Sequence, residues 1–145
     1  MCYPDSLLRG ISGKFVDSEG ILSGEAFQLD SVRKDGFCEI SIAWYDEPAA
    51  FDILMKQKSE RTDEIQFKYG AAEIERKALD IYMKPHVLAN QFKYEKKPTA
   101  ENPYHGNLLV LNELTPAMKK IIKVKLAALG NVNIHPNPYC AVESE

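Results

Sequence analysis

The chain has 145 residues, 45% of them hydrophobic and 27% charged, with a formal net charge of -3. These are ordinary values for one globular domain, and a chain of this size can bury a core without disulfides or a metal. The acidic balance argues against a dedicated polyanion binder, and no apolar run reaches the roughly 18 residues of a membrane span.

The first third of the chain contains its clearest strand. Residues 7–11 predict a short helix or an entry strand, and Asp35-Gly36 predicts a turn. Residues 37–45 then alternate in polarity as a strand does. One face would carry Glu39, Ser41 and Ala43, and the opposite, more apolar face would include Cys38 and Trp44.

The middle of the chain predicts one helix and several short elements. A helix begins at Pro48, because proline suits the first helical position and the preceding acids complement the positive end of the helix dipole. Residues 65–69 predict a strand, residues 70–79 a short helix or irregular turn, and residues 79–83 another strand that Pro85 stops.

A long polar loop is predicted over residues 90–107, followed by a strand over residues 108–111. The best helix begins at Thr115-Pro116, where Thr115 can cap the first turn, and Gly130 fits its C-terminal cap. We therefore predict an α+β fold: one domain over residues 1–130, with a mixed or antiparallel sheet and two or three helices, and an extended proline-containing tail over residues 131–145.

The location of the protein is inferred from its cysteines and its N-terminal segment. Three widely spaced cysteines, Cys2, Cys38 and Cys140, favour reduced thiols over a disulfide framework, with a Cys2–Cys140 bridge as the less favoured alternative. The N-terminal segment carries Asp5 and no long apolar region, so we expect no secretory signal. The expected location is the cytoplasm.

The leading candidate site surrounds His105, immediately before the strand predicted at residues 108–111. A neutral imidazole can act as an acid or a base near pH 7, and Asn102, Tyr104 and Asn107 could orient it or hold a substrate. The alternative is structural: Asn102-Pro103 forms a turn, Tyr104 packs, and His105 caps the strand.

Arg9 is the second candidate, because it lies between apolar residues and beside Gly10. Its guanidinium could bind an anion that approaches the backbone closely at the glycine. The alternative is an arginine that extends its charged end to solvent or pairs with a carboxylate. If Arg9 and His105 line one cleft, the catalytic interpretation of both is strengthened together.

Other motifs are weak. His86, His135 and Cys140 lack the spacing of metal ligands, and no glycine-rich phosphate loop or serine-hydrolase elbow is present, so we predict neither a metal nor a cofactor. Basic residues lie beside aromatic ones at 92–97 and follow one another on the predicted C-terminal helix. They include Lys119, Lys120, Lys123 and Lys125, and could contact nucleic acid or form a solvated helix face.

Three functions fit this sequence. The first is a small binding or accessory module that acts through a protein partner, with an exposed patch near Phe92, Tyr104 or Tyr139. The second is a small enzyme for a phosphate- or nucleotide-like ligand, with Arg9 holding the anion and His105 transferring a proton. The third is a nucleic-acid binder that uses the lysine-rich helix and the polar loop. No catalytic motif decides whether the protein is an enzyme.

Overall fold

The computed structural model describes residues 3–29 and 31–140. Its six strands form one antiparallel sheet in the order β4-β5-β2-β1-β3-β6. The strands are β1 (Ser6–Ile11), β2 (Phe37–Trp44), β3 (Gly70–Glu75), β4 (Phe92–Lys96), β5 (His105–Leu111) and β6 (Ile134–Pro136). The helices in the described part of the chain are α1 (Pro48–Lys56), α2 (Arg76–Met83) and α3 (Pro116–Gly130), with 3-10 turns η1 (Gly13–Phe15) and η2 (Gly24–Phe27). The predicted α+β class is confirmed.

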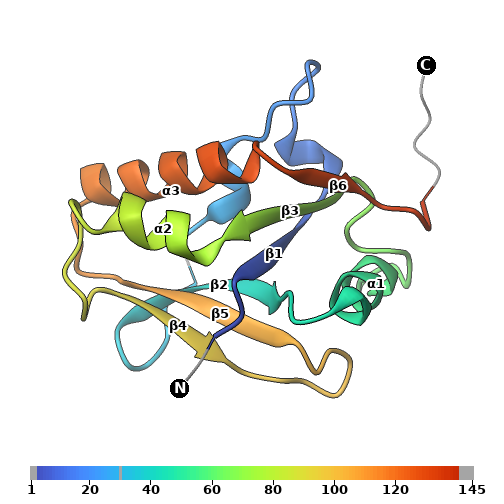
Figure 1. Cartoon of the computed structure of the whole chain (residues 1–145), viewed down its shortest axis with the longest axis horizontal. Helices are drawn as coiled ribbons and strands as arrows, with labels where there is room; N and C mark the ends of the chain where they lie inside the picture. Colours follow the sequence, from blue (N-terminus) through green and yellow to red (C-terminus); the bar gives the residue numbers. More distant parts are fainter. Residues whose placement is uncertain (1–2, 30, 141–145) are drawn as a thin grey trace.

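The helices cover the two faces of the sheet unequally. Helices α2 and α3 lie side by side over one face, and α1 lies against the other face beside β1 and β3 (Figure 1). The larger core joins α3 and η2 to the apolar face of the sheet, with Ile40, Ile42 and Trp44 from β2. The smaller core packs Leu54 and Met55 of α1 against the other face. Beyond α1, that second face carries polar side chains of β2, β4 and β5.

Two helices begin where local sequence predicts. Pro48 is at the start of α1, after Glu47 in extended conformation. Thr115 caps α3, because its hydroxyl accepts a hydrogen bond from the Met118 backbone N–H. Gly130 is the last residue of α3 and does not form its cap. A Cβ there would lie 3.0 Å from Leu22 and 3.2 Å from Ala72, so the glycine permits close packing.

The types of secondary structure predicted for residues 65–83 are wrong. Residues 65–69 form only an isolated bridge between Ile65 and Lys58, whereas Gly70–Glu75, expected as a helix or turn, is strand β3. Residues 79–83, expected as a strand, belong to helix α2. A short apolar run is compatible with both the helical and the strand periodicity of apolar residues. Tertiary packing selects the helix, because Leu79 and Met83, one helical turn apart, are both buried in the larger core.

Two predicted irregular segments contain strands. Residues 90–107 include β4, which pairs with β5. The predicted tail includes β6, which pairs with β3 along the edge of the sheet, and Asn137, whose side chain is buried and donates to the Met55 and Phe67 carbonyls. The chain therefore stays attached to the sheet beyond residue 130. Residues 141–145 and Cys2 lie outside the described residues, and Cys38 is buried, as predicted.

Candidate functional site

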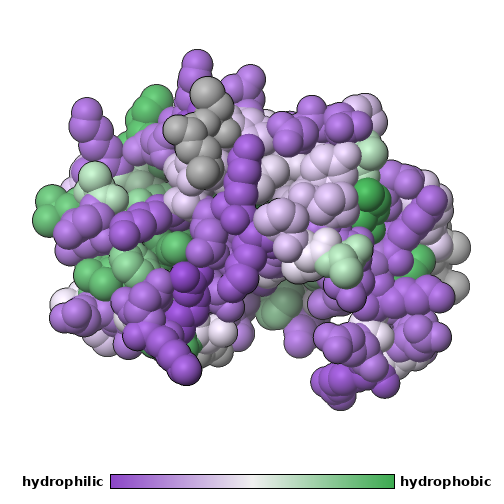
Figure 2. All heavy atoms as spheres, turned by 90° about the horizontal axis from the view of Figure 1, so that it is seen from below, coloured by the Kyte–Doolittle hydropathy of each residue, from purple (hydrophilic) through white to green (hydrophobic). Residues whose placement is uncertain are grey.

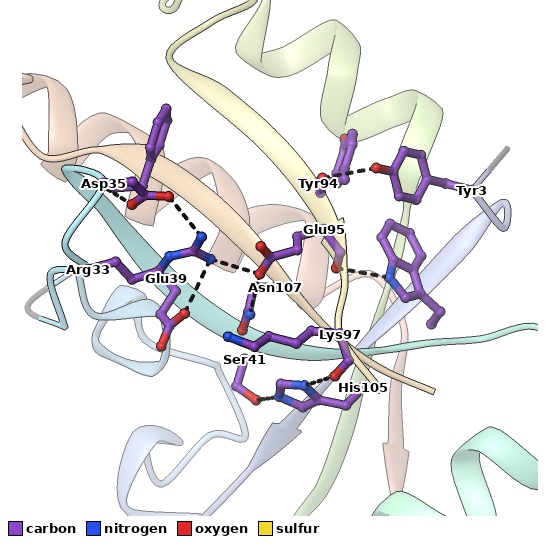
Figure 3. A network of polar contacts seen from close by, with 12 residues as sticks. Tyr3, Arg33, Asp35, Glu39, Ser41, Tyr94, Glu95, Lys97, His105 and Asn107 are labelled. Carbon is purple, nitrogen blue, oxygen red and sulfur yellow. Dashed lines mark hydrogen bonds and ion pairs between the residues drawn. The ribbon is translucent and has the colours of Figure 1, made fainter. Parts of the chain in front are cut away.

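The sheet face that α2 and α3 leave uncovered carries a polar surface over β2, β5 and β4. Cross-strand pairing brings Ser41 opposite Asn107 and Asn107 opposite Glu95, while His105 pairs with Ala43. Along each strand these side chains alternate with residues that face the larger core, such as Ile40, Leu108 and Tyr94, so they point to the opposite face. Figure 3 shows two sets of contacts on this face: one joins Arg33, Glu95 and Asn107, and the other joins Ser41, His105 and Lys97.

Arg9 and His105 line the same cleft, although 96 positions separate them in the sequence. The cleft has a volume of about 440 Å³, within the range of small-molecule sites. Its walls come from β1, β2, β5, and the segments that follow η2 and β4. The lining residues are Arg9, Gln28, Ser31, Glu39, Ile40, Ser41, Lys97, Thr99, His105 and Asn107.

His105 is held between a hydroxyl and a backbone carbonyl. Its Nδ1 lies 2.9 Å from the Lys97 carbonyl oxygen, and its Nε2 lies 2.7 Å from Ser41 Oγ (Figure 3). A carbonyl oxygen can only accept a hydrogen bond, so Nδ1 carries a proton. In the neutral ring Nε2 is then the acceptor, and Ser41 donates to it. This orients a basic nitrogen toward a hydroxyl group.

The strand geometry explains why these groups meet. Ser41 and His105 are diagonal neighbours on β2 and β5, close enough for a long side chain to cross between strands. Lys97 continues the β4–β5 ladder, because its N–H donates to the His105 carbonyl at 2.9 Å. The backbone of Lys97 therefore holds His105 in two ways: its N–H bonds to the His105 carbonyl, and its carbonyl bonds to the His105 ring.

Arg9 fills the space where β1 and β2 separate. The two strands pair only at Leu7–Trp44 and Leu8–Ala43. Beyond this point Arg9 donates from Nη1 to the Ser41 carbonyl, and from Nε and Nη2 to the Ala26 carbonyl. The guanidinium has five N–H groups, so one on each terminal nitrogen is not used by these bonds.

The charge of Arg9 has no carboxylate partner among residues 3–29 and 31–140. Burial lowers the pKa of Arg9 to about 10, so the group is still cationic at neutral pH. A desolvated cation without a counterion is unfavourable, and an anion in the adjoining cleft would offset that cost. Glu39 also lines the cleft, but its carboxylate is 3.6 Å from Arg33.

Asn107 is buried and oriented by Glu95. Its Nδ2 donates to Glu95 Oε1 at 2.8 Å, and the same oxygen accepts from Arg33 at 2.8 Å. Burial alone would raise the pKa of Glu95, but the bonds from Asn107 and Arg33, with the charge of Arg33, lower it below its usual value. Glu95 is therefore an ionised anchor that fixes which way the Asn107 carboxamide faces.

Tyr104 and Asn102 do not line the cleft that contains Arg9. Tyr104 packs on the smaller core and lines a separate hollow of about 130 Å³ with His105 and Trp44. Burial and a hydrogen bond to Glu47 raise its pKa. Asn102 is buried, and its Oδ1 accepts from the Tyr104 N–H, which shapes the loop before β5. Of the five predicted site residues, the cleft brings together Arg9, His105 and Asn107.

The prediction missed Ser41, Lys97 and Thr99 as cleft residues. A signal for Ser41 was present, because strand alternation put it on the polar face of residues 37–45. No sequence signal links it to His105, since register between distant strands is a tertiary property. The suggested role of Gly10 is not available, because the Phe67 ring covers it: a Cβ added to Gly10 would lie 2.5 Å from the ring carbons.

A second cleft, of about 590 Å³, lies between η2 and α3. Lys119, Lys120 and Lys123 line it from the helix, and Glu25 faces them, 3.4 Å from Lys123. Gln28 lines both clefts, so the two are neighbours. Lys119 is bonded to Asn112, which leaves Lys120 as the least constrained of the three cations.

No group of three or more potential metal ligands occurs in the part of the chain that the structure describes. Over the same residues, none of the helices combines the length and apolar character needed to cross a membrane. The chain matches no protein-family model, and comparison with curated proteins and with solved structures finds no match.

Proposed function

We propose that the protein is a small enzyme that binds a phosphate- or carboxylate-bearing ligand in the cleft between Arg9 and His105. The observation that carries this proposal is the convergence of these two side chains on one cleft of small-molecule size. Arg9 would anchor the anion, His105 would transfer a proton, and Asn107 would position the ligand by its oriented carboxamide.

The electrostatics of the cleft support an anion rather than a cation. Arg9 has no carboxylate partner in residues 3–29 and 31–140, and Lys97 adds a second positive charge. Glu39 is the opposing charge in the lining, and Arg33 partly neutralises it. A partly desolvated site strengthens each of these interactions over its value in water.

Calorimetry with inorganic phosphate, AMP and adipate tests this function. At least one of these anions should bind the wild-type protein, and Arg9→Gln should weaken that binding by about 10-fold or more. Arg76→Gln is the matched control, because Arg76 also donates to a backbone carbonyl, that of Pro4, but lies outside the cleft. Equal binding by both variants, or no binding of any anion by the wild type, would contradict the proposal.

A binding module for a protein partner is the second candidate. It is supported by exposed apolar side chains on and beside α2 and α3, of which Ile81 is 73% and Leu88 67% exposed. Figure 2 shows the side of the molecule away from α2 and α3, which is mainly hydrophilic with small separate apolar patches, so a partner bound on that side would rely on polar contacts. Tyr139, from the predicted patch, is 46% exposed.

Nucleic-acid binding is supported by one observation, the row of lysines along the second cleft. Single-stranded binding there should weaken steeply with salt, because each phosphate contact releases counterions. Lys120→Gln should lower affinity for a short oligonucleotide and reduce the salt slope. Binding that does not change with salt, or no binding at low ionic strength, would remove this candidate.

A further inference from the structure

We propose that Ser41 is the nucleophile of this cleft, activated by His105, and that the substrate is an ester that carries a carboxylate or phosphate group. This inference rests on the proposed function, because it uses the same cleft and the same anion anchor. It assigns a catalytic role to Ser41, which strand alternation alone did not distinguish from an ordinary surface serine.

Three features of Ser41 support the assignment. Its Oγ lies 2.7 Å from Nε2 of His105, within the range for a hydroxyl paired with a general base. The Lys97 carbonyl fixes the proton on Nδ1, so Nε2 is the nitrogen available to take a proton from Ser41. Ser41 is also exposed on the cleft side of the sheet, so a ligand can reach it.

Two cations of the cleft would assist the proposed acyl transfer. Arg9 donates to the Ser41 carbonyl, which ties the nucleophile's backbone to the anion anchor. Lys97 lines the cleft, and its side chain runs across the same face of the sheet in Figure 3. A cation beside the reacting carbon stabilises the negative charge that develops on the carbonyl oxygen.

The reaction balances with water as the co-reactant. Ser41 Oγ attacks the ester carbonyl carbon while its proton passes to His105 Nε2. The bond from this carbon to the alkoxy oxygen then breaks, and Nε2 returns the proton to the leaving alcohol. Water next attacks the acyl-Ser41 ester and gives a proton to Nε2. The acid is released, and Ser41 Oγ regains its proton.

The test compares two p-nitrophenyl esters with the same acyl chain length. The adipate half-ester carries a terminal carboxylate, and the hexanoate ester does not. We expect the wild type to release p-nitrophenol from the adipate half-ester with a kcat/KM about 10-fold higher than from the hexanoate, since one ionic contact distinguishes them. Acid quenching followed by peptide mass spectrometry should locate the adipoyl group on Ser41.

Variants separate the nucleophile from its neighbours. Ser41→Ala should abolish the adduct and reduce hydrolysis to background, and His105→Gln should reduce acylation by about 100-fold or more. Ser18→Ala is the control, because Ser18 is an exposed serine that lies outside the cleft. It should stay within about two-fold of the wild type.

Calorimetry with adipate distinguishes failure of this inference from failure of the proposed function. Adipate binding without an acyl-Ser41 adduct would overturn the assignment of Ser41 as the nucleophile but would support the proposed ligand site. An adduct on another residue, or full hydrolysis by Ser41→Ala, would overturn it equally. Absence of adipate, AMP and phosphate binding would overturn both proposals together.

Discussion

Two histidines toward opposite edges of the sheet show how a partner sets the role of an imidazole. His135 on β6 places Nε2 2.8 Å from Glu73 Oε1, and its ring packs edge-on against Phe51. A carboxylate only accepts, so Nε2 of His135 is a donor. At His105 the Lys97 carbonyl makes Nδ1 the donor, and Nε2 faces the Ser41 hydroxyl. His135 is thus a structural link between β6 and β3, whereas His105 presents a basic nitrogen to a hydroxyl.

Each histidine region depends on an adjacent glycine, and replacing these glycines should give the largest effects. A Cβ at Gly70 would lie 2.0 Å from the His135 carbonyl oxygen, at a φ of +144°. A Cβ at Gly106 would lie 2.4 Å from the Glu95 carbonyl oxygen and from Trp44 Nε1. We expect Gly70→Ala and Gly106→Ala each to cost about 2–3 kcal/mol of unfolding free energy in urea.

The two glycine variants should differ in what else they change. Gly106→Ala should also weaken anion binding, because β5 carries His105 into the cleft. Gly70→Ala should leave binding near wild type in the fraction that is folded. Identical effects on binding would show that the two regions are not independent.

Asn137→Ala tests the attachment of the β6 region to the rest of the fold. The Asn137 side chain donates to the Met55 and Phe67 carbonyls and accepts from the Tyr139 N–H. Its removal leaves buried carbonyl groups without their partner, so we expect a loss of about 2 kcal/mol. Hydrogen exchange should show faster opening of β6 than of β5, whereas uniform exchange would contradict a local anchor.

Replacing the histidines themselves should separate stability from function. We expect His135→Ala to cost about 1 kcal/mol, through loss of the Glu73 bond and the Phe51 contact, and to leave ester hydrolysis unchanged. His105→Ala should cost no more than about 1 kcal/mol and should eliminate hydrolysis. Thermal unfolding and hydrolysis rates measured on the same samples check both. The reverse pattern would make His135 the functional residue.

An effect of similar size on stability concerns the carboxylate network behind the cleft. The folded pKa of Glu95 is lowered, because the bonds from Asn107 and Arg33 outweigh its burial. Ionised Glu95 therefore contributes stability above its usual pKa, and this contribution is lost as the pH falls through the lower folded value. Glu95→Gln should cost about 1 kcal/mol near neutral pH.

The difference in unfolding free energy between wild type and Glu95→Gln should then shrink in acid, below pH 4.5, the ordinary pKa of a glutamate carboxyl. Urea titrations at neutral and acidic pH measure it. A difference that stays constant over this range would mean that the charge of Glu95 does not stabilise the fold.

Local signals were sufficient for the elements in which several of them agree. Pro48 and Thr115-Pro116 mark the starts of α1 and α3 because capping and the fixed φ of proline act within one turn. The strand at 37–45 follows from alternation, which also put Ser41 on the polar face. His105, Arg9 and Asn107 could be singled out as polar groups beside apolar segments, although Tyr104 and Asn102 were singled out for the same reason and lie outside the cleft.

Long-range packing settled the rest. The run 79–83 is a helix because Leu79 and Met83 reach the core, and β4 and β6 are strands because the edges of β5 and β3 accept them. The cleft itself depends on long-range register, which sets Ser41 diagonal to His105, and on the separation of β1 from β2, which Arg9 fills. Propensity acts over a few residues, whereas the contacts that form the cleft join residues 32 to 96 positions apart.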